Sequence, residues 1–139
     1  MAEVAALRAI VGEDHVREAR DEDAIDGVRP ALVAMPGSIE EVSGTMELAT
    51  RAGWRVAPRG CGSGVGLGNP PAALDLVLDL RRLDAILEHA AGDLVVAVEA
   101  GVPLADLQRT VGSAGQMLAL DPPEPAGTGG GVIATNAAG

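Results

Sequence analysis

The sequence predicts an α/β (α+β) fold that begins with a small parallel β-α-β subdomain and continues into a mixed or antiparallel α+β subdomain. Two patterns carry this prediction. A capped amphipathic helix stands between two short apolar runs, and a later pair of apolar runs flanks a tight turn. The 139 residues suffice for one domain or part of one. We expect the first subdomain to span residues 1 to about 80 and the second to span residues 81–139.

The N-terminal segment predicts a helix followed by an acidic surface stretch. Gly12 stands where this helix would end, after apolar residues that share one helical face. The acidic residues from 13 to 23 are expected to be solvated, because carboxylates are rarely buried. The apolar face consists of Val4, Leu7, Ile10 and Val11.

A strand, a helix and a second strand follow with short connections. Residues 31–35 form a continuous apolar run closed by a proline, as in a strand buried on both faces. Ser38 and Glu41 have the spacing of a capping box, and Gly53 stands at the C-cap position. Residues 54–58 predict the next strand, so the connection should be a right-handed parallel crossover. The expected buried stripe of the helix is Ile39, Val42, Met46 and Ala49.

The second half of the chain predicts strands before helices. Residues 74–80 read as a strand of alternating pattern, with Asp79 in a surface or turn role. Residues 83–89 and 94–99 flank a tight turn and predict an antiparallel hairpin. Beyond it we expect a helix that starts at Pro103 and buries Leu104, Leu107 and Val111. A strand at 116–120 and a stiff proline-rich loop at 121–125 should follow. A last helix is expected to begin near Val132, and its N-terminus would favour an anion.

The composition excludes several classes of partner. The net charge of −10 argues against nucleic acid and anionic membrane surfaces, which both require a basic patch. All ten cationic side chains are arginines, so the glycine-lysine phosphate loop of nucleotide hydrolases is absent. No apolar run approaches the ~20 residues of a transmembrane helix and no signal peptide opens the chain, so we expect a cytoplasmic protein. Cys61 is the only cysteine, and His15 and His89 lack ligand spacing, so no metal site is expected.

Two glycine loops, at residues 58–68 and 127–136, form the candidate ligand site. Glycines let backbone N–H groups turn toward one concavity, where they bind phosphate oxygens without side chains. The first loop follows a strand of the parallel sheet, at the carboxyl edge where α/β sheets bind ligands. It fails the GxGxxG spacing and leads into a strand, which disfavours a nicotinamide-binding Rossmann site. Arg59 is the nearest cation for a diphosphate, and a flexible surface loop without a ligand is the alternative.

Four motifs occur in a fixed order along the chain, at residues 35–42, 56–64, 98–107 and 127–131. With this ordered set the chain resembles the FAD domain of the vanillyl-alcohol oxidase type, also called the PCMH-type flavin domain. The resemblance covers nearly the whole chain. It is nearest to the flavin-binding subunits of bacterial glycolate oxidase and to related D-lactate dehydrogenases.

The resemblance implies FAD as a non-covalent cofactor. The Arg-Gly-x-Gly-Ser-Gly loop would wrap the FAD pyrophosphate, and the Thr-x-Gly-Gly run would lie along the ribityl and isoalloxazine side. Ser63 stands where covalent members of the family carry the linking histidine, and residues 111–139 contain no cysteine for a cysteinyl link. The candidate cofactor-binding residues are Pro58, Arg59, Gly60, Cys61, Gly62, Ser63, Gly64, Pro122, Gly127, Thr128, Gly130, Gly131 and Thr135.

The function that the resemblance implies is the FAD-binding part of an oxidoreductase acting on 2-hydroxy acids such as glycolate or D-lactate. Flavin supplies the hydride chemistry, so the protein contributes position and electrostatics, and no residue of this chain is assigned a catalytic role. We expect later strands and a substrate domain to lie beyond Gly139. Other subunits of an oxidase complex are the expected partners, and they would hold the protein at the inner membrane face. A catalytically inactive FAD or diphosphate module and an inert fragment are the alternatives.

Overall fold

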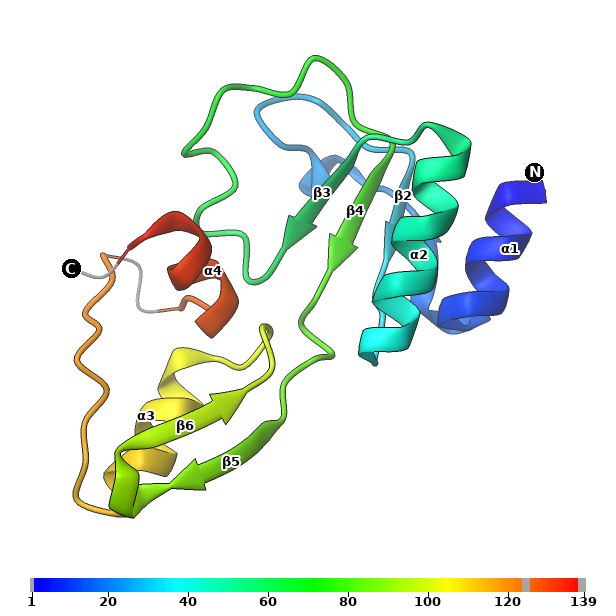
Figure 1. The fold of residues 1–139 in the computed structure, drawn as a ribbon. Helices are drawn as coiled ribbons and strands as arrows, with labels where there is room; N and C mark the ends of the chain where they lie inside the picture. Colours follow the sequence, from blue (N-terminus) through cyan, green and yellow to red (C-terminus); the bar gives the residue numbers. More distant parts are fainter. Residues whose placement is uncertain (1, 124–125, 138–139) are drawn as a thin grey trace. The chain divides into compact units, whose positions relative to one another are not determined.

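The computed structural model describes residues 2–123 and 126–137, in two compact units. The first unit comprises residues 1–59 and 65–82, and the second comprises residues 60–64 and 83–139. The predicted α/β class is confirmed, with a largely parallel sheet in the first unit and an antiparallel hairpin in the second (Figure 1). In the described part of the chain, no helix has the length and apolar character needed to cross a bilayer.

The first unit is built on a four-stranded sheet with the order β1-β2-β4-β3. β2 and β3 both pair with β4 in parallel, and β1 pairs with β2 antiparallel. The predicted strand-helix-strand unit is therefore present, with β4 inserted between its two strands. The strands are β1 (Val16–Glu18), β2 (Leu32–Ala34), β3 (Val56–Arg59) and β4 (Leu76–Asp79).

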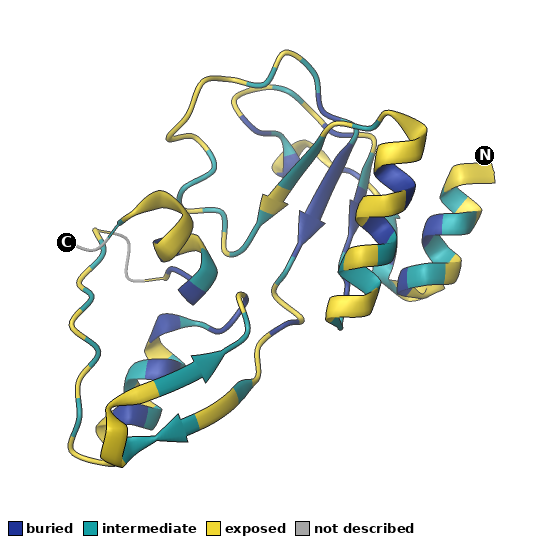
Figure 2. Cartoon of the chain, in the orientation of Figure 1, coloured by how far each residue is buried: buried dark blue, intermediate teal, exposed yellow. Residues whose placement is uncertain are grey.

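β4 occupies the centre of the sheet because both of its faces are apolar. All four of its residues are buried, which corrects the alternating pattern expected for this strand (Figure 2). Leu76 and Leu78 belong to the core cluster under the helices, whereas Val77 points to the second cluster on the other face. A fully buried strand of this kind is typical of parallel sheets.

Two helices, α1 (Ala2–Val11) and α2 (Ile39–Ala52), pack on the first of these clusters. The predicted caps are confirmed: Ser38 Oγ accepts a hydrogen bond from the Glu41 amide, and Gly53 adopts the left-handed conformation. The predicted stripe of α2 is partly wrong, because Ile39 and Met46 are 69% and 41% exposed. The residues that α2 buries are Thr45, Leu48 and Ala49. Two short 3-10 turns, η1 (Glu13–His15) and η2 (Asp21–Asp23), complete this unit.

The second unit pairs β5 (Ile86–Ala90) with β6 (Val95–Val98) across the turn η3 (Ala91–Asp93), as predicted. Helix α3 (Leu104–Gly112) buries the three residues expected of it, and Leu107 and Val111 form a core with Val102. The last helix, α4 (Gly129–Thr135), begins three residues before Val132.

The predicted strand at residues 116–120 is wrong, because this segment pairs with no strand. Its groups bond locally instead: the Gln116 amide N–H donates to Val111 O at 3.1 Å and the Leu120 amide N–H to Leu118 O at 2.8 Å. The Gln116 side chain donates to Ala91 O at 2.5 Å, and the Leu118 amide donates to Gln108 Oε1 at 3.1 Å. Of the proline-rich loop at 121–125, residues 124–125 lie outside the described residues.

Leu76 is fully buried at the centre of the sheet, so Leu76→Ala should lower the free energy of unfolding by about 2–5 kcal/mol. Urea unfolding followed by circular dichroism measures this change. Leu87→Ala is the matched control, because Leu87 is 63% exposed and its loss should change stability by less than about 0.5 kcal/mol. Equal losses in both variants would contradict the central placement of β4.

Candidate functional site

The first glycine loop, residues 60–64, follows directly after β3 and presents unpaired backbone amides. Within the described part of the chain, no acceptor takes a hydrogen bond from the N–H of any residue from Gly60 to Gly64. Gly62 has a φ of 89°, which a side chain would strain, so a glycine is needed for the loop to turn here. Gly60, Gly62 and Gly64 are half-buried, whereas Cys61 and Ser63 are exposed. Such a run of free donors is suited to an anion.

The second glycine loop uses its amides inside the protein. The Gly129 amide donates to Val102 O at 2.8 Å, and the Gly130 amide donates to Ala100 O at 2.9 Å. Thr128 caps α4, since its Oγ1 accepts from the Gly131 amide at 3.3 Å. The first three amides of this helix therefore already have acceptors, and the expected anion-favouring N-terminus is not available.

The two loops touch at one point, where Gly60 lies against the side chain of Thr128. A Cβ atom on Gly60 would overlap Thr128 Oγ1 and lie 3.1 Å from its Cγ2. Thr128 is 2% exposed. Gly130 is similarly confined, because a Cβ atom there would lie 2.8 Å from both Cβ and O of Ala100. Both glycines are required by close packing.

Arg59, the last residue of β3, lies in an ion-pair network of the first unit. Its guanidinium donates to Asp23 Oδ1 at 3.0 Å and to Asp79 Oδ2 at 3.2 Å, and its side chain is 13% exposed. Arg17 binds Asp23 through both carboxylate oxygens, at 2.6 and 2.9 Å. Arg81 does the same for Asp79, at 2.9 and 2.7 Å. The prediction that Asp23 and Asp79 are surface residues is wrong, because the arginines allow these carboxylates to be buried.

Hydrogen bonds keep both buried carboxyl groups ionised. Burial raises the pKa of Asp79, but the hydrogen bonds from Arg81 and Arg59 outweigh it and hold the pKa below its usual value. The hydrogen bond from Arg17 lowers the pKa of Asp23 and outweighs the effect of burial there as well. Three guanidinium groups and two buried carboxylates thus bond to one another.

The remaining predicted site residues lie around the two loops. Pro58 is exposed on β3, and the Cys61 thiol is free and exposed. Gly127 is buried and its carbonyl accepts from the Leu104 amide at 3.0 Å. The exposed Thr135 donates its hydroxyl to Gly131 O at 2.8 Å, and Pro122 is half-buried.

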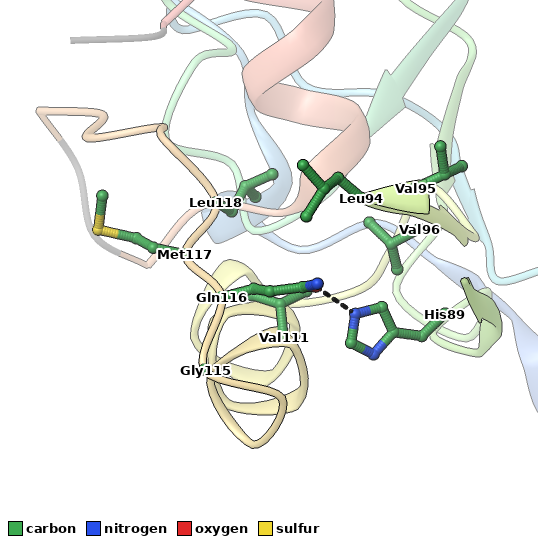
Figure 3. Close-up of a pocket in the computed structure, with 9 residues that line it drawn as sticks. All are labelled: His89, Leu94, Val95, Val96, Val111, Gly115, Gln116, Met117 and Leu118. Carbon is green, nitrogen blue, oxygen red and sulfur yellow. Dashed lines mark hydrogen bonds between the residues drawn. The ribbon is translucent and has the colours of Figure 1, made fainter. Parts of the chain in front are cut away.

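A separate hollow of about 340 Å³ lies in the second unit, beside β6 and the segment after α3 (Figure 3). Its polar members are His89 and Gln116, joined by a 2.9 Å contact between Nε2 and Oε1. The side-chain NH₂ group of Gln116 donates to Ala91 O. The Gln116 Oε1 atom can only accept, so His89 Nε2 carries the proton in their contact. No sequence pattern predicted this hollow, because residues 116–120 were expected to form a strand. It contains no ionic side chain and is a poor match for a diphosphate.

The comparisons with known proteins agree with the fold. Residues 30–139 match the FAD binding domain family, so the chain belongs to that family. It is 33% identical to D-lactate dehydrogenase of Anaerostipes hadrus over 140 residues, which cover 99% of this chain and 29% of that protein. It is 35% identical to D-2-hydroxyglutarate dehydrogenase of Xanthomonas citri over 111 residues, which cover 79% of this chain and 24% of that protein.

Solved structures of the same fold include alkyldihydroxyacetonephosphate synthase and p-cresol methylhydroxylase. The first has a TM-score of 0.86 at 23% identity and covers 99% of this chain and 32% of its own. The second has a TM-score of 0.78 at 18% identity, and the match covers 95% of this chain and 28% of that structure's chain. The resemblance to PCMH-type FAD domains is thereby confirmed. The chain spans between about a quarter and a third of the length of these proteins.

The first loop fits the cofactor of this family. FAD carries a diphosphate, and the loop offers five consecutive amides without a protein acceptor within the described part of the chain. Gly62, in the middle of this loop, has the positive φ that lets the backbone turn there. Among the described residues, no group of three or more His, Cys, Asp or Glu gathers as a metal site would require.

Because the pKa of Asp79 is lowered in the folded state, its contribution to stability is present above the ordinary carboxyl pKa and is lost as the pH falls below about 4. Asp79→Asn should lower the free energy of unfolding at pH 7 by about 3 kcal/mol or more, since it removes one of the two carboxylates that pair with the largely buried Arg59 side chain. It should also flatten the loss of stability toward acid. Urea unfolding between pH 3 and 7 tests both effects, with the exposed Asp84→Asn as control. Parallel pH profiles for all three proteins would contradict this role.

Proposed function

We propose that the chain binds FAD without a covalent bond and that the amides of Gly60 to Gly64 hold its diphosphate. The observation that carries this proposal is the run of five amides directly after β3 that find no acceptor among residues 2–123 and 126–137. A hydrogen bond to a charged oxygen contributes on the order of 1.5–3 kcal/mol, so three or four such contacts suffice to hold a diphosphate. Ser63 supports the non-covalent mode, because it stands where a linking histidine would be needed.

Arg59 in this proposal acts at the base of the loop. Its side chain is held by Asp23 and Asp79, so the amides carry most of the diphosphate contact. From the second loop, the exposed Gly131 and Thr135 are the members that a flavin can reach. Pro58, Cys61, Pro122, Gly127 and Gly130 complete the proposed cofactor-binding set, whereas the buried Thr128 supports the first loop without touching the cofactor.

For this FAD-binding domain as part of a protein as long as its relatives, the activity that we propose is oxidation of a 2-hydroxy acid, with glycolate and D-lactate as candidates. The names of the relatives, D-lactate dehydrogenase and D-2-hydroxyglutarate dehydrogenase, support this class of substrate. FAD, when bound, would supply the hydride-accepting chemistry, and this chain would bind and orient the cofactor. Other oxidase subunits as partners and a cytoplasmic location are part of the same proposal. A binding module without turnover is the second candidate, because the chain spans less than a third of those relatives.

Gly62→Val should weaken FAD binding at least about tenfold, because a β-branched residue at positive φ distorts the turn that aims the amides. Titration of the purified chain with FAD, followed by flavin fluorescence anisotropy, measures the dissociation constant. Gly68→Val is the matched control: it lies in the same glycine-rich run, has no positive φ, and nothing lies within 4 Å of its Cβ position. The proposal would be contradicted if the parent chain did not bind FAD, or if all three proteins bound it with equal affinity.

Reduction of the bound flavin separates the two candidate functions. If the chain alone oxidises D-lactate, glycolate or D-2-hydroxyglutarate, the flavin absorbance bleaches under anaerobic conditions. Bound flavin that resists all three acids and is still reduced by dithionite identifies a binding module.

A further inference from the structure

We propose that Thr128 is a positioning residue for the first glycine loop, and that it supports FAD binding through its fit against Gly60 instead of through contact with the flavin. This inference rests on the proposed function, since it assigns the diphosphate to the amides of residues 60–64. It concerns residues of the second unit alone.

Thr128 is itself held from several directions. Its hydroxyl accepts from the Gly131 amide, its carbonyl accepts from the Val132 amide at 3.0 Å, and its backbone forms a bridge with Pro103. The next residue donates its amide to Val102 O at 2.8 Å, and Val102 is fully buried in the core under α3. The side chain of Thr128 is therefore a fixed surface of the second unit.

Gly60 rests on that surface. A Cβ atom on Gly60 would overlap Oγ1 of Thr128 and lie 3.1 and 3.2 Å from its Cγ2 and Cβ. The amides of residues 60–64 bond to no acceptor in the described part of the chain, so hydrogen bonds donated by these amides do not locate the loop. The contact with Thr128 limits where the first of the five amides can lie. A loop fixed before binding loses less conformational entropy when the ligand arrives.

The burial of Thr128 argues against direct contact with the cofactor. Only 2% of the residue is exposed, and its oxygen already accepts a hydrogen bond within the chain. Direct contact and positioning make different predictions for Thr128→Val. Valine keeps the branched shape that supports Gly60 but loses the hydroxyl, whereas Thr128→Ala loses both.

The test is an FAD titration of the full chain and of four variants: Thr128→Val, Thr128→Ala, Gly60→Ala and the double variant Gly60→Ala/Thr128→Ala. We expect Thr128→Val to bind FAD within about threefold of the parent, and Thr128→Ala and Gly60→Ala to bind about tenfold or more weakly. The double variant should recover at least about threefold over Gly60→Ala, because removal of the threonine side chain makes room for the new methyl group. Circular dichroism melting confirms that each variant is folded.

Equal losses in Thr128→Val and Thr128→Ala, with no recovery in the double variant, would overturn positioning in favour of a hydroxyl that binds the flavin. Lower melting temperatures with unchanged FAD affinity would also overturn it, because they would show support of the fold alone. If the parent chain binds no FAD, the proposed function fails on its own. Proteolysis at the loop then tests the positioning: Thr128→Ala should be cleaved near Gly60 faster than Thr128→Val, and equal rates would contradict the inference.

Discussion

Backbone amides that have no acceptor are the constraint around which the candidate site is organised. An amide N–H that is buried away from water without an acceptor costs free energy, and folded proteins keep few of them. The five amides from Gly60 to Gly64 have no protein acceptor among the described residues, whereas the amides at the start of α4 all have acceptors within the chain. The contrast divides two glycine runs of similar composition. The first has donors left for a ligand, and the second holds the structure on which Gly60 rests.

The negative charge of the chain explains why neutral amides are suited to bind a diphosphate. A protein with a net charge of −10 does not attract a dianion by its overall field. Neutral amides avoid this difficulty, because they need no counter-charge when no ligand is bound. The arginine that precedes them would be an unpaired buried cation without Asp23 and Asp79, which explains why two carboxylates are buried beside it. Each of these two carboxylates bonds to the Arg59 guanidinium and to one further arginine.

Local patterns predicted most of the elements, and long-range contacts account for the errors. The caps of α2 at Ser38 and Gly53 depend on neighbours within a turn, so their residue types sufficed. The burial of Asp23 depends on Arg17 and Arg59, and the latter lies 36 residues away in the sequence. The central place of β4 depends likewise on strands from other parts of the chain. The prediction of the first loop as a site needed only its glycines, but no local signal told which amides would remain unpaired.

Glycine content alone therefore does not identify a phosphate loop. Gly130 is needed because Ala100 leaves no room for a side chain, and Gly60 because Thr128 leaves none, whereas Gly62 is needed for its positive φ. Of these three, only Gly62 has the backbone conformation that aims successive amides toward one side. The packing of Gly60 brings the first loop against the buried Thr128 and so limits where the turn at Gly62 can point. Close packing at Gly60 and the positive φ of Gly62 thus both determine where the five amides lie.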